Sequence, residues 1–207
     1  MTTDVANAHP GAPEAEDPMA PLRLQGRAPR RLETPRTVLE VPRPEHAPAF
    51  LDGVLASLPA LLYVDWHPHL PGWAERFCAD DARCFDEGRD LAWHVFARDD
   101  AGWVGRIDVH TIDAGARRGE IGYVGHAARS GQGLMREAVA AVLQACWALG
   151  FQRIEAMSDA RNARALRFAE SAGLQREGLL RRHERDPQGR WCDVVILSAL
   201  NPVPPPG

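Results

Sequence analysis

Residues 118–150 read RGEIGYVGHAARSGQGLMREAVAAVLQACWALG, and the rest of the chain is organised around this stretch. Its first part alternates around Ile121 and Tyr123, which is typical of a strand. Apolar residues then recur at helical spacing from Leu134 to Leu149, and Gly150 stands where a helix C-cap glycine belongs. The stretch therefore predicts a strand, a glycine-rich turn and a long helix.

The turn reads RSGQG at residues 129–133, and its two glycines let successive backbone N–H groups point one way. Such a turn before a helix suits a phosphate, although ordinary loop closure uses the same residues. Two other phosphate motifs are excluded. Arg136 stands where the dinucleotide fingerprint needs a third glycine, and the chain has no lysine for a P-loop.

The composition is that of an ordinary globular protein. The 207 residues suffice for one domain, with 45% hydrophobic and 25% charged residues. The net charge of −4 gives no basic excess, so nucleic acid is not an expected partner and a cationic acceptor is favoured. The absence of lysine excludes Schiff-base chemistry and a lysine-anchored pyridoxal cofactor.

Neither the cysteines nor the histidines have metal-binding spacing. Cys78, Cys84, Cys146 and Cys192 form no C-x-x-C pair, and His67-x-His69 lacks a third ligand at suitable spacing, so no metal is expected. No apolar run could span a membrane, and the N-terminus has no secretory apolar segment. The expectation is a reduced, cytoplasmic protein without membrane contact.

Composition and periodicity divide the chain into three parts. Residues 1–31 are predicted to form a disordered or loosely attached arm, residues 32–200 one domain, and residues 201–207 a proline-rich tail. Strands are predicted at 37–41, 91–97, 103–112, 120–125, 153–157, 174–184 and 190–200. Helices are predicted at 45–58, 72–88, 134–149 and 162–172. This order predicts a mixed sheet with helices on its faces.

That order, with its motifs, resembles the GNAT superfamily of N-acetyltransferases, and in particular its RimJ/RimL-like branch. Residues 32–36 (LETPR) look like the opening L-x-T-x-R of the branch, and residues 120–123 (EIGY) match its E-[IL]-G-Y strand. Residues 131–138 (GQGLMREA) match G-x-G-[YLI]-[MA]-x-E-A. Asn162, Glu170, Gly173, Glu177-Gly178 and Asp193 also fall in register.

The resemblance implies an α+β fold of the GNAT type. A central, mostly antiparallel mixed sheet of about seven strands would splay between strands 4 and 5, with about four helices around it. Acetyl-CoA would be the cofactor, with its pantetheine arm pairing with the free strand edge. The residues implied to bind it are Tyr123, Val124, Gly125, Arg129, Ser130, Gly131, Gln132, Gly133, Leu134, Met135, Asn162 and Phe168. For Phe168, ordinary helix–sheet packing is an equal alternative.

The chain departs from the family pattern at positions that matter for chemistry. Ala128 replaces the Gln or Arg that usually opens the pyrophosphate loop, with Arg129 beside it as a substitute. Ala165 and Ala169 stand where the branch usually has Ser and other branches have Tyr, side chains able to reprotonate the departing thiolate. The alternative to an N-acetyltransferase is therefore a catalytically impaired, CoA-binding regulatory module.

The resemblance implies direct transfer of acetyl to a primary amine, either a protein N-terminus or a small molecule. Glu120 is the candidate base, because the ammonium must lose a proton before it attacks; a salt-bridged surface carboxylate is the alternative. His94, His110 and His126 are weaker alternatives. The expected acceptor-binding residues are Tyr63, Asp65, Trp66, His67 and Asp193, although Trp66 equally suits the rim of the core and Asp193 a hairpin brace. A homodimer through the last hairpin is also conceivable.

Overall fold

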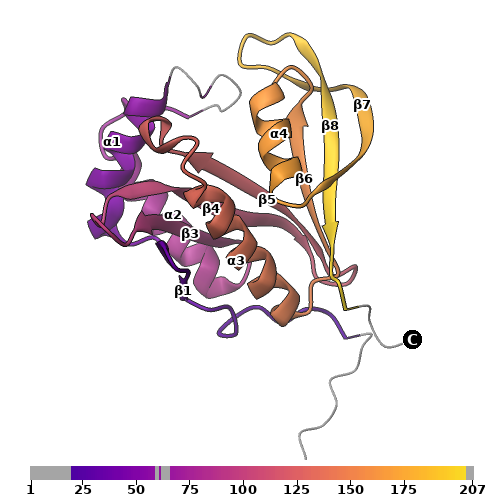
Figure 1. The fold of residues 1–207 in the computed structure, drawn as a ribbon, viewed down its shortest axis with the longest axis horizontal. Coiled ribbons are helices and arrows are strands. Elements are labelled where there is room, and N and C mark those ends of the chain that lie inside the picture. Colours follow the sequence, from indigo (N-terminus) through magenta and orange to yellow (C-terminus); the bar gives the residue numbers. More distant parts are fainter. Residues whose placement is uncertain (1–19, 59–60, 62–65, 204–207) are drawn as a thin grey trace, which may run out of the picture.

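The computed structural model describes residues 20–58, 61 and 66–203. Figure 1 shows a single twisted sheet with helices on both sides. The strands are β1 Arg31–Glu33, β2 Thr37–Glu40, β3 Leu91–Ala97, β4 Trp103–Asp113, β5 Arg118–Gly125, β6 Arg153–Asp159, β7 Gln175–Arg185 and β8 Trp191–Leu200. The α-helices are α1 Ala47–Ser57, α2 Trp73–Glu87, α3 Leu134–Leu149 and α4 Ala163–Ser171, and short 3-10 turns lie at Pro44–His46 and Ala127–Arg129.

The expected fold class is confirmed. The sheet order is β1-β2-β3-β4-β5-β6-β8-β7, and every neighbouring pair is antiparallel except β5 with β6. The seven predicted strands are present, together with an additional three-residue strand, β1, which pairs with β2. Sequence patterns missed β1 because three residues are too few to show a period of two.

Two apolar cores hold the layers together. The larger core packs α3 and α4 on the sheet through Val139, Val142, Ile107, Ile154 and other buried side chains. The smaller core joins α1 and α2 to β4 around Phe50 and Trp103. Figure 1 shows α3 and α4 in front of the sheet and α2 behind it. The sheet is therefore covered on both faces over its first half.

The sheet opens between its two parallel strands. β5 pairs with β6 only from Arg118 to Glu120, against Arg153 to Glu155, whereas β5 stays paired with β4 as far as Gly125. The residues of β5 after Glu120 thus have no strand partner on the β6 side within the described chain. This is the splay expected between the fourth and fifth predicted strands, and it leaves a free strand edge at the centre of the molecule.

The packed domain begins earlier than expected. Leu24 and Ala28 are buried in the larger core, and the backbone carbonyl of Pro29 accepts a hydrogen bond from the indole Nε1 of Trp93 at 3.0 Å. Residues 20–30 therefore contact the core ahead of the boundary predicted at residue 31. The proline- and glycine-rich composition of this segment hid its few apolar anchors, which have no helical or strand periodicity.

All cationic partners in the ion pairs of the structure are arginine or histidine, because the chain contains no lysine. The most buried pair is bidentate: Arg106 of β4 donates from Nε and Nη2 to Asp81 of α2 at 2.7 and 2.8 Å, and Nη1 donates to Asp108. This network ties α2 to the face of the sheet that carries Glu120. No helix among the described residues is long and apolar enough to cross a membrane.

Candidate active site

A cavity of about 440 Å³ lies where the sheet opens. It is lined by the end of β5, the glycine turn, the start of α3 and one side of α4. The sequence-predicted residues that line it are Tyr123, Val124, Gly125, Arg129, Ser130, Gly131, Gly133, Leu134, Met135, Asn162 and Phe168. A depression of about 590 Å³ between residues 27–33 and the last turns of α3 has no glycine turn or helix N-terminus beside it.

The glycine turn is shaped to present N–H groups to this cavity. Gly131 and Gly133 adopt positive φ values of 79° and 77°, a region that strongly favours glycine, and a Cβ added at Gly131 would meet no atom within 4 Å. Gly133 is also the N-cap of α3, which has no capping side chain. The N–H groups of the first turn of α3 are thus left for a ligand, at the positive end of the helix dipole.

Gln132 is the predicted cofactor residue that does not line the cavity, and its backbone has a different task. Its carbonyl oxygen accepts a hydrogen bond from Nη1 of Arg36 at 3.0 Å. Because a trans peptide is planar, the N–H of Gly133 points opposite to that carbonyl. Arg36 therefore fixes the orientation of the Gln132–Gly133 peptide.

Glu137 in the first turn of α3 holds Arg36 in place. Its carboxylate accepts hydrogen bonds from the backbone N and the Nε of Arg36 at 2.8 and 2.7 Å, and from the hydroxyl of Thr34. Burial alone would raise the pKa of Glu137, but these hydrogen bonds together outweigh it and lower the pKa, so the carboxylate stays charged. The residues were visible in the LETPR and GQGLMREA motifs, but sequence alone gave no sign that the two motifs touch.

Two other arginines border the glycine turn. Arg129, the substitute expected beside Ala128, pairs with Asp100 in the β3–β4 turn at 2.7 Å. Arg164 of α4 reaches across to the hydroxyl of Ser130 at 2.9 Å. A phosphate at the turn would therefore meet Arg164 directly, whereas Arg129 would have to share its charge with Asp100.

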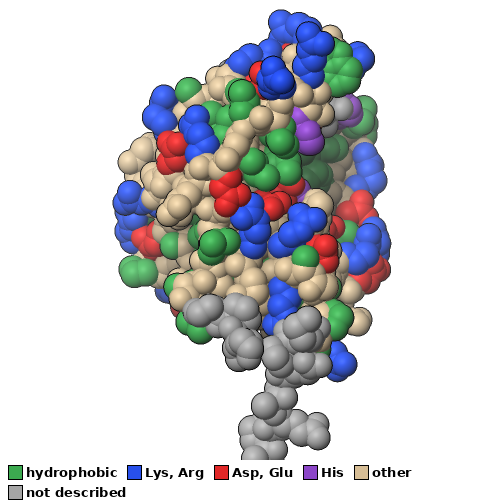
Figure 2. Space-filling model, turned by 90° about the vertical axis from the view of Figure 1, so that its right-hand side faces the viewer, with side chains coloured by type: hydrophobic (Ala, Val, Ile, Leu, Met, Phe, Trp, Pro, Cys, Tyr) green, Lys and Arg blue, Asp and Glu red, His purple; other side chains and the backbone are tan. Residues whose placement is uncertain are grey.

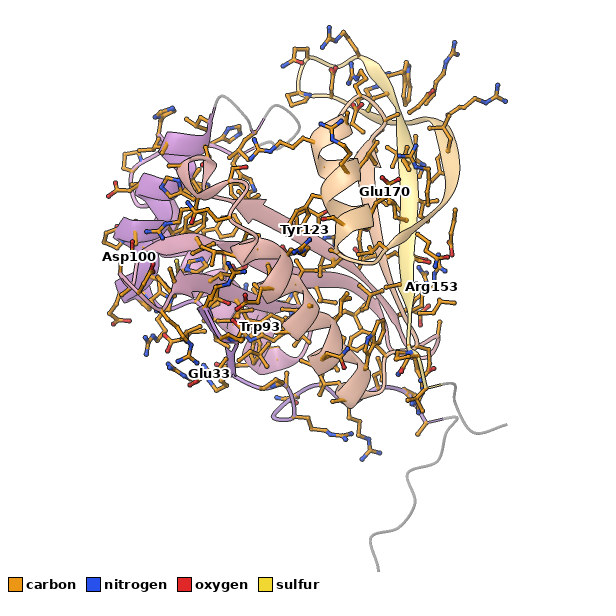
Figure 3. All side chains as sticks on the ribbon, viewed as in Figure 1. Glu33, Trp93, Asp100, Tyr123, Arg153 and Glu170 are labelled. Carbon is orange, nitrogen blue, oxygen red and sulfur yellow. The ribbon has the colours of Figure 1, made fainter. Side chains whose placement is uncertain are left out.

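The α4 side of the cavity combines an amide, an aromatic ring and a hydroxyl. Asn162 caps α4 by accepting from the N–H of Ala165 at 3.1 Å, which leaves its amide nitrogen to donate to a ligand. Phe168 lines the cavity and also packs on Tyr123, with ring centroids 4.7 Å apart. Figure 3 shows Tyr123 centrally placed beside α4. Its hydroxyl lies 3.5 Å from the carbonyl oxygen of Ala165, and burial raises its pKa to about 12.

Glu120 lies at the base of the splay, outside the residues that line the cavity. It is half-buried and lies opposite His110 of β4 and Glu155 of β6 in the strand register. Burial raises the pKa of Glu120; the neighbouring His110 lowers it, and the carboxylates of Glu184, Glu155 and Asp108 raise it further. A carboxyl group in this setting accepts a proton more readily than a solvated one.

The expected acceptor-binding residues are distributed over different environments. Tyr63 and Asp65 lie outside the described residues. Trp66 packs in the aromatic cluster of the smaller core, with ring centroids 5.2 Å from Phe77, in line with the alternative of a core rim. His67 is exposed. Asp193 accepts a hydrogen bond from the backbone N of Arg182 at 2.8 Å and so braces the last hairpin, as the alternative for it anticipated.

The three histidines considered as alternative bases also separate. His94 is fully buried among rings, and burial holds its pKa well below the usual value. His126 accepts from the N–H of Ala128 at 3.1 Å and so caps the 3-10 turn beside the cavity. His110 is partly exposed and sits next to Glu120 in the register, which makes it the histidine best placed to influence that carboxylate.

A sheet opened between parallel strands, with a glycine turn and an uncapped helix facing the gap, has the shape and the N–H donors that suit an extended phosphorylated ligand. Comparison with known proteins identifies a family that is consistent with such a ligand. The family model described as "Acetyltransferase (GNAT) domain" matches residues 36–175, more than half of the chain. The protein therefore belongs to the GNAT acetyltransferase family.

Named relatives share part of the sequence, and solved structures share the fold. The Bacillus subtilis protein named "Probable N-acetyltransferase YjcK" is 35% identical over 118 residues, which span 55% of this chain and 65% of the relative, just under two thirds of its length. The microcin C7 self-immunity acetyltransferase MccE superimposes with a TM-score of 0.74 at 18% identity, covering 81% of this chain and 93% of that one. RimJ of Mycobacterium smegmatis does so with a TM-score of 0.71 at 24% identity, covering 79% and 81%.

Proposed function

We propose that this protein transfers the acetyl group of acetyl-CoA to a primary amine. The observation that carries the proposal is the single cavity wall made by the free edge of β5, the glycine turn and the uncapped start of α3. An extended thiol ester with a pyrophosphate at one end fits such a wall. The solved structures of MccE with acetyl-CoA and AMP, and of RimJ with CoA-disulfide, support the same cofactor.

The cofactor would lie along the opening of the sheet. The pantetheine amides would pair with backbone groups of Tyr123, Val124 and Gly125, as an added strand does. The pyrophosphate would accept hydrogen bonds from the N–H groups between residues 129 and 134, with the dipole of α3 behind them. Asn162 would donate its free amide hydrogens, and Phe168 would cover the arm from the α4 side.

Glu120 would prepare the acceptor for attack. An alkylammonium with a pKa of about 10 is almost entirely protonated at neutral pH, so a base must remove a proton first. The half-buried carboxylate of Glu120, with its raised pKa, accepts that proton directly or through one water molecule. The neutral nitrogen would then attack the thioester carbon and form a C–N bond; the C–S bond would break with its electron pair on sulfur, and the nitrogen would release its second proton to solvent.

The departing thiolate would be stabilised by Tyr123. Ala165 and Ala169 carry no hydroxyl, and Ala169 is buried in the larger core. The hydroxyl of Tyr123 reaches the carbonyl of Ala165 and so occupies the region that a longer side chain there would fill. Its pKa of about 12 lies above the value of about 8.5 for a thiol, so Tyr123 donates a hydrogen bond and solvent supplies the proton.

The deciding experiment is thermal unfolding of the purified protein with and without acetyl-CoA, with NAD as the control ligand. A ligand that binds only the folded protein raises Tm by mass action. We expect a rise with acetyl-CoA alone, followed by release of free CoA when amine acceptors are added. A rise in Tm without CoA release from any amine would favour the alternative of a CoA-binding regulatory module; no rise at saturation would refute the proposal.

A further inference from the structure

The β7–β8 hairpin carries three arginines that differ from their neighbours. Arg181, Arg182 and Arg185 are exposed, and none forms an ion pair with a carboxylate among the residues that the structure describes. Other arginines of the same C-terminal unit are paired: Arg176 with Glu170 and Arg190 with Asp186, both at 3.0 Å. Figure 2 shows basic side chains gathered at the upper end of the molecule, over this hairpin.

The backbone holds these arginines outside the regular strand. β7 and β8 are in register at Leu180 with Val194 and again at Glu184 with Cys192, so residues 181–183 bulge opposite the single residue Asp193. Arg182 has a positive φ of 52°, a region costly for a side chain, and its N–H is held by the Asp193 carboxylate. The bulge is therefore a defined feature that turns consecutive arginines outward.

Arg185 extends the same surface across the hairpin. Its guanidinium lies 4.3 Å above the ring of Trp191, which is itself 55% exposed, and donates to the carbonyl of Gly189 at 3.3 Å. Stacking on an indole leaves the outer edge of a guanidinium available to a carboxylate. We call Arg181, Arg182 and Arg185 the arginine rim.

The side chains around Glu120 carry more carboxylates than arginines. Glu184, in the same part of the hairpin, is close enough to act on Glu120, as are Asp108 and Glu155. Asp108 shares Arg106 with Asp81, so one guanidinium serves two carboxylates. Glu155 pairs with Arg118 at 3.3 Å and with Arg153 at 2.6 Å, so Glu120 and Glu184 are the carboxylates of this group without an arginine partner among the described residues. These two carboxylates make the floor of the acceptor side acidic, whereas its rim is basic.

We propose that the acceptor is the N-terminus of an acidic polypeptide, whose first carboxylates bind the arginine rim while its ammonium group enters the acidic floor beside Glu120. This inference rests on the proposed acetyl transfer. A small polyamine would be attracted by the floor and repelled by the rim, since it carries positive charge at both ends. A peptide that is cationic at its terminus and anionic a few residues later complements both regions.

The test compares three peptides with the same first two residues, Ala-Gly, followed by four Glu, four Gln or four Arg. We expect kcat/KM for the Glu peptide to exceed that for the Gln peptide by about tenfold at low ionic strength, mainly through KM. The preference should shrink when salt is raised to about 0.5 M, because exposed charges are then screened. Equal values for the three peptides would overturn the proposal.

The variant R181Q/R182Q/R185Q should lose the preference for the Glu peptide and keep the acetyl-CoA shift in Tm. The matched control is R30Q/R83Q/R89Q, which removes the same charge from arginines that are more than half exposed and lie on or near α2. The control should keep the preference. Loss of preference in both variants would mean that net charge, and not the rim, selects the acceptor.

The remaining outcomes separate this inference from the proposed function. Acetylation of small amines but of no peptide would overturn the rim proposal and leave acetyl transfer intact. Inhibition by RNA, together with indifference to peptide charge, would mark the rim as a nucleic-acid surface and also overturn it. No acetyl-CoA shift and no CoA release with any amine would refute acetyl transfer itself.

Discussion

The two sides of the split sheet present different chemical groups. On the α3–α4 side, the cavity presents backbone N–H groups, two glycines in positive φ and apolar side chains. On the Glu120 side, the same strands present carboxylates, histidine and arginines whose charges act on one another. The first side suits acetyl-CoA, which would be the same in every reaction. The second side suits the amine acceptor, which would be selected by its charge. We therefore expect that substitutions on one side change acetyl-CoA binding, and that substitutions on the other side change reaction with the acceptor.

The change with the largest expected effect is Glu120→Gln. Removing a general base typically costs about 10²- to 10⁴-fold, so we expect kcat to fall by at least about 100-fold. The affinity for acetyl-CoA should stay unchanged, because Glu120 lies outside the cavity lining. Steady-state kinetics and the acetyl-CoA shift in Tm measure the two quantities. Weaker cofactor binding would show that the two sides are not separable.

Gly131→Val tests the α3–α4 side, where the glycine turn lies. The substitution strains a backbone at φ 79° and places a branched side chain where a phosphate must approach, so we expect acetyl-CoA affinity to fall by at least about tenfold. Gly26→Val is the matched control, because Gly26 has a φ of 70°, also meets no atom within 4 Å and lies outside the lining of the cavity. Equal affinity in the two variants would show that the turn does not hold the cofactor.

Tyr123→Phe tests the hydroxyl proposed to stabilise the departing thiolate. It removes the hydroxyl beside Ala165 and keeps the ring that packs on Phe168. We expect kcat to fall by about tenfold, the order for one lost hydrogen bond of roughly 1.4 kcal/mol, with the dissociation constant for acetyl-CoA nearly unchanged. A variant with full activity would mean that solvent alone stabilises the thiolate.

Arg36→Gln tests whether the glycine turn is positioned from outside. Loss of the contacts to Gln132 and Glu137 should weaken acetyl-CoA about fivefold, as expected for about 1 kcal/mol, and leave the KM for S-acetylpantetheine, which has no pyrophosphate, unchanged. Arg98→Gln is the control, since Arg98 bonds the carbonyl of Thr34 and pairs with Glu33 but does not touch the turn. If Arg36→Gln weakened acetyl-CoA and S-acetylpantetheine equally, the substitution would have destabilised the protein in general.

The smallest expected effect is a shift in the acid limb of the pH profile. In the proposed mechanism Glu120 is active as a carboxylate, so kcat/KM should rise with pH through a pKa above the usual value of 4.5. His110→Asn removes the neighbour that lowers this pKa, so the limb should move to higher pH. A profile measured with a peptide acceptor of fixed charge tests this; movement to lower pH would contradict the assignment of Glu120 as the base.

Much of the fold could be predicted because its periodic elements are long. The seven longer strands and the four helices follow from apolar spacing, and the splay between β5 and β6 follows from the resemblance to the GNAT family. β1 and the packed segment 20–30 could not be predicted, because their contacts are long-range and their residues show no period. In short segments the local sequence pattern does not determine the structure, and tertiary contacts determine it instead.

The candidate site divides in the same way. The glycines of the turn could be proposed because the turn requires glycine at fixed positions, and the other predicted lining residues because the resemblance to the GNAT family implies them. The link from Arg36 to Gln132, the bulge at residues 181–183 and the arginine rim could not, since each depends on which of many arginines meets which carboxylate. The expected acceptor residues Tyr63 and Asp65 and a homodimer through the hairpin stay predictions.

The absence of lysine has a consequence for a protein that handles a reactive thioester. Acetyl-CoA modifies exposed ε-amines and erases their charge, yet Arg106, Arg153, Arg36 and the arginine rim carry guanidinium groups that stay protonated and unreactive under such conditions. Its side chains thus offer no competing primary amine, and its ion pairs do not weaken as the acetyl-CoA supply rises. Arg36, Arg106 and Arg153 therefore keep the charge on which their ion pairs depend.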